Sequence, residues 1–157
     1  MLAEERTFVA IKPDGVQRGL IGDVITRFER KGFKILAMKL IQVSDEQAKE
    51  HYIEHEGKPF HPRLIKYIQS GPVVVMVIKG YGVVDSVRHI VGATNPINAD
   101  VGTIRADFAQ VMEYNVIHAS DSITSAEREI GIYFNEDEIL DTWQTKTEEL
   151  IEEDELL

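Results

Sequence analysis

Hydrophobic and polar positions along the chain predict short strands that alternate with helices. Apolar residues that alternate or run together, as is typical of strands, occur at residues 7–12, 33–41, 73–79 and 116–117. Apolar residues at helical spacing occur at residues 20–31, 64–68, 83–91 and 123–134. Ser44 and Gln47 form a capping box that starts a further helix. Because residues 33–41 are apolar on both alternating sets, we expect that strand to be covered on both faces, on one of them by a partner subunit.

The order of these elements predicts an α+β fold. Two βαβ-like halves indicate a ferredoxin-like βαββαβ sandwich, in which a four-stranded antiparallel sheet is covered by helices. A doubly wound parallel sheet is the alternative. Residues 93–115 show little regular pattern, and an irregular segment of this length is uncommon in a compact domain unless it has a function.

Length and charge indicate one domain with an acidic tail. The 157 residues are 43% hydrophobic, which predicts a single domain over residues 1–157. The net charge of −10 is concentrated in residues 136–157, which hold ten acidic residues against Lys146 alone. The rest of the chain has 17 acidic and 16 basic residues, so it has no basic excess with which to bind nucleic acid.

The chain contains no cysteine, which excludes a disulfide, a thiolate nucleophile and a cysteine-ligated zinc. The absence of disulfides suits a cytoplasmic protein. No apolar run approaches the roughly 18 residues of a membrane span, and no signal-peptide pattern is present. We therefore expect a soluble, cytoplasmic protein with no membrane partner.

Residues 115–122 place His118 where a short buried strand passes into a helix. Ser120, Asp121 and Ser122 are good N-cap types, and the free N–H groups of a helix start favour an anion. Glu129 follows further along the same helix. An imidazole beside an anion site and near a carboxylate has the parts of a nucleophile that is oriented by a base. The alternative interpretation is a turn histidine that bonds only its Asp and Ser neighbours.

Other candidate residues lie at the ends of predicted elements, where phosphate-binding side chains are useful. A P-loop, a G-x-S-x-G elbow and an H-E-x-x-H motif are all absent from the sequence. His51 and His55 are spaced to share a helix face around a metal, but an exposed polar helix end has the same letters and no third ligand is evident. The remaining candidates are Lys12, Arg88, Thr94, Arg105 and Asn115, with Phe60 as an apolar face for a base.

Several separated motifs make the chain similar to the nucleoside diphosphate kinase family from Glu5 to about Phe134. The motifs are ERTFVAIKPDGV at 5–16, SGPVV at 70–74, Gly92 with TNP at 94–96, GTIRADF at 102–108, NVIHASDS at 115–122 and AEREI at 126–130. Their number and order make the resemblance specific. It implies an enzyme that transfers the γ-phosphate of a nucleoside triphosphate, mainly ATP, to nucleoside and deoxynucleoside diphosphates by a ping-pong mechanism.

The resemblance also implies roles for individual residues. His118 matches the nucleophile that becomes a phosphohistidine, Glu129 the carboxylate that holds its far ring nitrogen, and Ser120 a contact of that pair. The matches to residues that bind phosphates and ribose hydroxyls are Lys12, Tyr52, Arg88, Thr94, Arg105 and Asn115. The base is expected to stack on Phe60 beside Leu64 and Met112, with weak base discrimination. Mg²⁺ is the expected cofactor, and Asp121 its outer contact.

Two features depart from the family pattern. Ala119 stands where many relatives have Gly, and Met112 where Val is frequent. The acidic tail over residues 136–157 follows no pattern that we can place, which leaves the assembly open; relatives form hexamers or tetramers, and we expect a homo-oligomer, preferably a hexamer. The alternative functions are a nucleotide-binding scaffold or regulatory module of the same fold without turnover and, more weakly, a nucleic-acid-binding protein.

Overall fold

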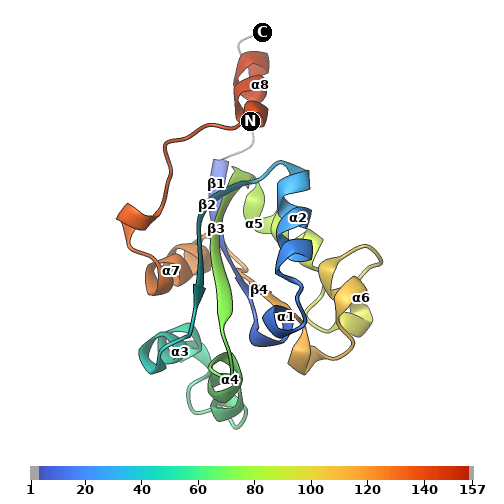
Figure 1. Cartoon of the computed structure of the whole chain (residues 1–157), viewed down its shortest axis with the longest axis vertical. Helices are drawn as coiled ribbons and strands as arrows, with labels where there is room; N and C mark the ends of the chain where they lie inside the picture. Colours follow the sequence, from blue (N-terminus) through green and yellow to red (C-terminus); the bar gives the residue numbers. More distant parts are fainter. Residues whose placement is uncertain (1–3, 156–157) are drawn as a thin grey trace.

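A computed structural model describes residues 4–155 of the chain, and their sheet has four strands (Figure 1). The strands are β1 (Glu4–Ile11), β2 (Lys34–Ile41), β3 (Val73–Tyr81) and β4 (Ile117–Ala119), in the order β2-β3-β1-β4. Every neighbouring pair is antiparallel. The predicted ferredoxin-like α+β sandwich is therefore confirmed, and the parallel sheet that we kept as an alternative is wrong.

The helices are α1 (Pro13–Gln17), α2 (Ile21–Lys31), α3 (Asp45–His51), α4 (His61–Ile68), α5 (Val83–Val91), α6 (Ile104–Phe108), α7 (Ile123–Tyr133) and α8 (Lys146–Glu155). The helices predicted at residues 20–31, 64–68, 83–91 and 123–134 and after Ser44 all form, and the structure adds α1, α6 and α8, which the sequence analysis did not predict. Short 3₁₀ helices are η1 (Ile53–His55), η2 (Pro96–Asn98), η3 (Met112–Tyr114) and η4 (Glu136–Glu138). The capping box of Ser44 and Gln47 starts α3 as predicted. Within residues 4–155, no helix has the length and apolar character that crossing a membrane requires.

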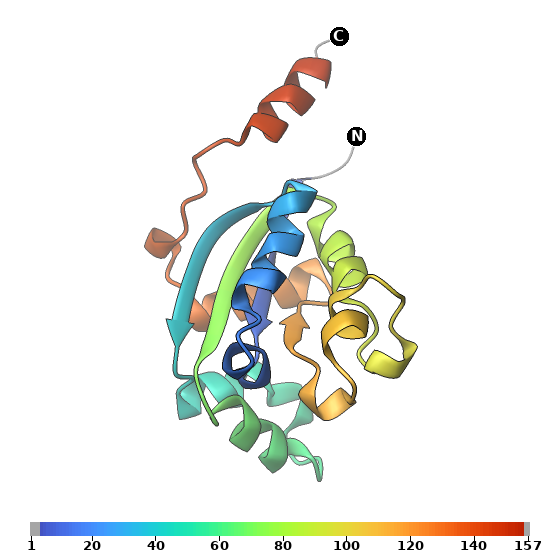
Figure 2. The same cartoon turned by 45° about the vertical axis from the view of Figure 1, so that its right-hand side comes forward.

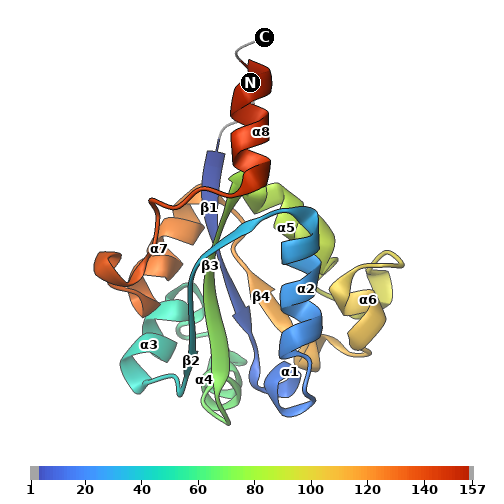
Figure 3. The ribbon, with the colours of Figure 1, turned by 45° about the horizontal axis from the view of Figure 1, so that its top comes forward.

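Alternate residues of β1 divide the core into two layers. Val9 and Ile11 belong to the cluster that also contains Phe28 of α2 and Val87 of α5. Phe8 and Ala10 point to the opposite face, where the cluster includes residues of α3, α4 and α7. Figure 3 shows α2 and α5 on one side of the sheet and α3 and α7 on the other. Residues 73–78 of β3 and residues 8–11 of β1 are apolar and buried on both faces, as is typical of central strands.

The edge strand β2 is only partly covered within one chain. Lys34 and Leu36 are buried, whereas Met38 is 52% and Leu40 64% exposed. The tail reaches this edge, because the backbone N–H of Leu140 donates to the carbonyl of Leu36 at 2.9 Å. The expected cover on the second face of residues 38–40 is therefore absent within the described chain, which leaves a partner subunit as a prediction.

The chain enters β4 through a strained residue. Val116 is buried and has a φ of 72°, in the left-handed region that a β-branched residue rarely adopts. Its N–H donates to Asp14 at 3.0 Å, and its carbonyl accepts from the N–H of Lys12 at 2.8 Å. The predicted strand at 116–117 is wrong in its bounds, because β4 is Ile117–Ala119 and His118 pairs with Ala10 in its middle.

A glycine after α5 brings the long loop close to this helix. Gly92 has a φ of +91°, and an added Cβ would lie 2.5 Å from the side-chain oxygen of Thr103. Its carbonyl accepts from Arg105 at 3.0 Å. Only glycine therefore meets both the backbone conformation and the space at this position.

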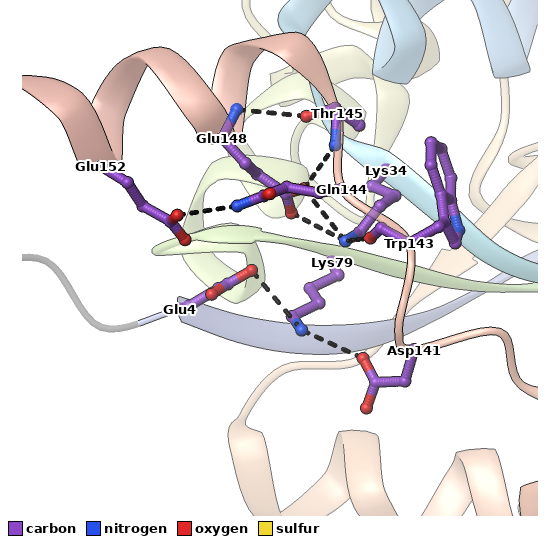
Figure 4. Close-up of polar contacts among 9 residues, drawn as sticks. All are labelled: Glu4, Lys34, Lys79, Asp141, Trp143, Gln144, Thr145, Glu148 and Glu152. Atoms are coloured by element: carbon purple, nitrogen blue, oxygen red, sulfur yellow. Dashed lines mark hydrogen bonds and ion pairs between the residues drawn. The ribbon is translucent and has the colours of Figure 1, made fainter.

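The C-terminal segment is fastened by a buried ion pair (Figure 4). Lys34 and Glu148 lie 2.9 Å apart and are almost fully buried, and Glu148 also accepts from the backbone N–H of Thr145 at 2.7 Å. Lys34 donates as well to the carbonyl of Trp143. Beside this pair, Lys79 contacts Asp141 at 3.0 Å. Helix α8 itself extends beyond the sheet (Figure 2), so these contacts hold the tail where it leaves the body.

Replacing Gly92 by Ala should destabilise the chain by about 2 kcal/mol, because the new Cβ meets Thr103 and the backbone must stay at positive φ. Urea unfolding measures the change. The matched control is Gly131→Ala in α7, where an added Cβ meets nothing within 4 Å. That substitution should leave stability unchanged or raise it by about 0.5–1 kcal/mol. Equal effects of the two substitutions would contradict this account.

Replacing Glu148 by Ala should release the tail without unfolding the body. The variant leaves Lys34 without its carboxylate, and undocking of the tail allows Lys34 to reach water. We expect faster cleavage by trypsin after Lys146, followed by mass spectrometry, at an unchanged midpoint of urea unfolding. The control is Glu153→Ala, which removes an exposed carboxylate of the same helix. Equal cleavage rates in the two variants would refute the role of the pair.

Candidate active site

A cavity of about 320 Å³ lies where the end of β1 meets β4 and the helices around them. Its lining comes from segments that are far apart in the sequence, including α3, α5 and α7. Nine of the residues selected from the sequence line it: Lys12, Tyr52, Arg88, Thr94, Arg105, Asn115, His118, Asp121 and Glu129. The structure thus brings together the cations and the candidate nucleophile that the motifs had suggested separately.

His118 is oriented by a buried carboxylate. Its Nε2 is hydrogen-bonded to Glu129, which is 3% exposed and also accepts from the hydroxyl of Ser120 at 3.2 Å. An ionised carboxylate only accepts hydrogen bonds, so Nε2 carries the proton and Nδ1 keeps a lone pair. Within residues 4–155, Nδ1 of His118 has no hydrogen-bond partner. The side chain is 29% exposed at the cavity, so this nitrogen is available to a ligand.

Lys12 and Thr94 are linked through Asn115. The ammonium of Lys12 donates to the side-chain oxygen of Asn115 at 2.8 Å, and the amide nitrogen of Asn115 donates to the carbonyl of Thr94 at 2.9 Å. Burial and the nearby charge of Arg105 lower the pKa of Lys12 to about 8. A bound phosphate would raise the pKa of Lys12 again, since its negative charge would stabilise the protonated ammonium.

Arg105 is buried and bonds the backbone of the long loop. Its guanidinium donates to the carbonyls of Asn115 at 3.4 Å, Gly92 at 3.0 Å and Ile117 at 2.7 Å. A guanidinium has five N–H donors, so these contacts leave donors for a ligand. Burial and the charge of Arg88 lower its pKa to about 10. Arg88 itself donates to the carbonyl of Ala119 at 3.2 Å, which places a second guanidinium at the cavity.

His51 is a neighbour of His118 that no motif in the sequence placed there. The two rings meet edge to face, with centroids 4.7 Å apart, and Nδ1 of His51 shares a hydrogen bond of 2.9 Å with the hydroxyl of Tyr133. Burial lowers the pKa of His51 well below its usual value, so the ring is neutral. Its position depends on packing between α3 and α7, which no local pattern reveals.

The metal-binding pair of His51 and His55 weighed from the sequence does not form. His51, His118 and Glu129 are the residues within 4–155 whose ligand atoms gather, all within 4.8 Å of one another. His55 instead packs against Phe60, with ring centroids 5.3 Å apart. Other cavity residues that the sequence analysis missed are Glu54, Ser125 and Arg128, and His55, which it considered only as a metal ligand, also lines the cavity. Only the position of Arg128 beside Glu129 in the helix gave a signal for any of them.

The residues expected to hold a base lie outside this cavity. Phe60 precedes α4 and is 43% exposed, Leu64 lies within α4, and Met112 of η3 is 51% exposed. The segments themselves are adjacent, because Tyr67 of α4 and Tyr114 of η3 pack with centroids 5.5 Å apart. Two apolar side chains therefore remain exposed on neighbouring segments.

Asp121 lies at the cavity beside the start of α7. Hydrogen bonds from Ser125 and Ser122 and the charge of Arg88 lower the pKa of Asp121, which keeps the carboxylate ionised. Ser122 is the N-cap, since its hydroxyl accepts from the N–H of Ser125 at 3.0 Å. One ionised carboxylate at a cavity lined by cations fits Mg²⁺, which commonly keeps its waters and binds through one or two carboxylates and substrate phosphates.

Comparisons with known proteins agree on one family. The family model described as nucleoside diphosphate kinase matches residues 5–139. A nucleoside diphosphate kinase of Archaeoglobus fulgidus is 55% identical over 150 residues, which are 96% of this chain and 99% of the relative. A nucleoside diphosphate kinase of Thermus thermophilus is 57% identical over 136 residues, which are 87% and 99% of the two chains.

A solved structure adds the same relationship in three dimensions. The halophilic nucleoside diphosphate kinase of Halobacterium salinarum in complex with CDP superposes with a TM-score of 0.90 at 46% identity, covering 95% of this chain and 99% of that one. Sequence and fold thus agree over almost the whole length. The chain belongs to the nucleoside diphosphate kinase family of enzymes.

Proposed function

We propose that the chain moves the γ-phosphate of a nucleoside triphosphate, mainly ATP, to nucleoside and deoxynucleoside diphosphates through a phosphohistidine on His118. The observation that carries this proposal is the pairing of His118 with Glu129, which leaves Nδ1 free at a cavity lined by cations. A neutral imidazole is a competent nucleophile at physiological pH. The CDP in the Halobacterium salinarum relative supports nucleotide binding by the same fold.

In the first half-reaction, the lone pair of Nδ1 forms a bond to the γ-phosphorus while the bond to the β-phosphate oxygen breaks. The nucleoside diphosphate leaves with that electron pair. The ring gains positive charge as the bond forms, and the hydrogen bond from Nε2 to Glu129 stabilises it. In the second half-reaction, a terminal oxygen of an acceptor diphosphate displaces Nδ1 from phosphorus. Donor and acceptor thus use one cavity in turn, which is a ping-pong mechanism.

Lys12, Arg88 and Arg105 are proposed to bind the transferring phosphates. Phosphoryl transfer depends mainly on positioning and on stabilising negative charge, so fixed cations are the principal requirement. The buried contacts of Arg105 and the link from Lys12 to Asn115 hold these groups in place before substrate arrives. Further polar contacts to phosphate and ribose are assigned to Tyr52, Thr94, Asn115 and, beside Glu129, Ser120.

Weak selection among bases follows from the exposed position of Phe60. A base that stacks on Phe60 beside Leu64 and Met112 would meet apolar surface and no base-specific hydrogen bond from these side chains. Met112 is flexible and accepts different shapes. We therefore expect purine and pyrimidine nucleotides to be accepted in both ribose and deoxyribose forms.

Mg²⁺ is the proposed cofactor, carried in on the polyphosphate. When bound, it supplies charge neutralisation of the phosphate oxygens. Asp121 is the residue that would hold one of its waters, since this carboxylate is ionised and lies at the cavity. Through that water, Asp121 would help to orient the polyphosphate toward His118.

A homo-oligomer, preferably a hexamer rather than a tetramer, is the proposed assembly. The exposed Met38 and Leu40 on the edge strand β2 support a second copy at this edge, since an apolar strand edge is otherwise prone to nonspecific pairing. Neither His118 nor its partner Glu129 lies on β2, so the catalytic pair is complete within one chain.

Incubation with γ-labelled ATP and Mg²⁺ tests the phosphohistidine. We expect a label on the protein that is labile to acid and stable to base and that moves onto added GDP or CDP. His118→Ala should carry no such label, whereas His89→Ala, which removes an exposed histidine of α5, should retain it. A label that forms but does not transfer would indicate the scaffold or regulatory alternative, and a label that survives in His118→Ala would refute the proposal.

The pH dependence of kcat/KM tests the role of Lys12. With a pKa of about 8, this lysine loses its positive charge as the pH rises through that value, so the free enzyme should bind phosphate less well. We expect kcat/KM to fall by about tenfold per pH unit well above pH 8. Lys12→Gln should start lower and lack this decline, and the exposed-site control Lys49→Gln should keep it. The same decline in Lys12→Gln would assign it to another group.

A further inference from the structure

A second and larger cavity, of about 580 Å³, lies between α1 and α4. It shares no lining residue with the cavity that contains His118. The two helices lie side by side at the same end of the sheet (Figures 2 and 3), and Tyr114 of η3 adds a third side. The catalytic proposal uses none of the residues that line this cavity, so its chemistry needs a separate account.

Helix α4 and the turn that follows it supply half of the polar lining. Arg63, Lys66 and Tyr67 have the spacing of three and four residues that places side chains on one helix face, and Ser70 lies in the turn after the helix. The opposite, apolar face of α4 contributes Ile65 and Ile68 to the core. The exposed face of this helix therefore carries two cations and one aromatic ring toward α1.

These two cations have no counter-ion among the residues that the structure describes. Within residues 4–155, neither the side chain of Arg63 nor that of Lys66 makes a hydrogen bond or an ion pair, and like charges three residues apart on a helix repel each other. Arg18 adds a third positive charge across the cavity, with one nitrogen donating to the carbonyl of Phe108 at 2.5 Å. A positive cluster in a chain of net charge −10 is a local feature that an anion would stabilise.

The only carboxylate among these lining residues is already engaged. One oxygen of Asp14 accepts from the hydroxyl of Tyr67, and the other accepts from the N–H of Val116 at 3.0 Å. Asp14 therefore fixes the two sides of the cavity to each other. Because both of its oxygens already accept hydrogen bonds, Asp14 makes no ion pair with Arg18, Arg63 or Lys66.

Two aromatic rings form an apolar surface in the same cavity. Tyr67 and Tyr114 pack edge to face with an interplanar angle of 73°, and Tyr114 remains 56% exposed. An exposed ring that is supported from behind by another is a good surface for stacking. The cavity is also large enough for a compact aromatic molecule, since small-molecule sites typically measure about 300–1,000 Å³.

We propose that this cavity is a second ligand site, which binds a small phosphorylated aromatic compound. The phosphate lies among Arg18, Arg63 and Lys66, and the ring stacks on Tyr114. Arg63 and Lys66 supply donors that have no partner within residues 4–155, and the paired tyrosines supply the apolar contact. Because no lining residue is shared, binding here does not depend on the phosphohistidine.

The test is isothermal titration of the full chain with 1-naphthyl phosphate, compared with 1-naphthol and inorganic phosphate. We expect saturable binding of 1-naphthyl phosphate, weaker binding of phosphate and none of 1-naphthol. The double variant Arg63→Gln with Lys66→Gln should lose at least about tenfold in affinity, since each charge-assisted hydrogen bond contributes that much or more. Tyr114→Ala should weaken binding of 1-naphthyl phosphate but not of inorganic phosphate.

Two controls assign the binding to this cavity. Arg30→Gln with Lys49→Gln removes the same charge at exposed positions elsewhere and should leave the affinity unchanged. Lys12→Gln alters the catalytic cavity and should also leave it unchanged. The proposal is overturned if the probe does not bind, if Lys12→Gln abolishes binding, or if the Arg63 and Lys66 variant binds normally. An unchanged urea midpoint shows that each variant is folded.

Discussion

The guanidinium of Arg105 fixes the most irregular part of the fold. This single buried cation bonds the carbonyls of Gly92, Asn115 and Ile117, so it joins the end of α5 to the entry of β4 across more than twenty residues of sequence. A loop of that length without a core of its own needs such internal hydrogen bonds. The contacts also hold a positive charge at the cavity that contains His118. The side chain of Arg105 therefore both stabilises the loop and lines the candidate active site.

The candidate active site then depends on where β1 ends. Ala10 pairs with His118 in the sheet. Lys12 lies two residues after Ala10, directly after the end of β1, and its backbone N–H donates to the carbonyl of Val116. The positive φ of Val116 turns the chain so that Asn115 reaches Lys12 while His118 stays in register. Strain at this one residue is offset by the hydrogen bond to Asp14 and by burial of the valine side chain. The candidate nucleophile His118 and the cation Lys12 are thus both positioned by the pairing of β1 with β4.

Local patterns predicted the elements well and their tertiary contacts poorly. The alternation of β1, the capping box of α3 and the N-cap of α7 all depend on neighbouring residues, so the sequence contains them. The packing of His51 on His118 depends on Tyr133 from a distant helix, and no spacing reveals it. The left-handed conformation of Val116 violates the preference of its residue type, which is why the predicted strand was shifted there. The sequence could not reveal the contacts of Arg105 either, because Arg105 bonds backbone carbonyls, which every residue type has.

The acidic tail does not repel polyanions from the candidate active site, because the tail is attached far from Lys12. The tail is fastened near the start of β1, where Lys79 contacts both Glu4 and Asp141, and Lys34 contacts Glu148. Lys12 directly follows the other end of β1, and the six residue-to-residue steps from Arg6 to Lys12 span about 20 Å at the rise of a strand. Charges are largely screened beyond about 8 Å at physiological ionic strength. The tail therefore gives the chain most of its net charge of −10 with little effect on the potential that an incoming phosphate meets at Lys12.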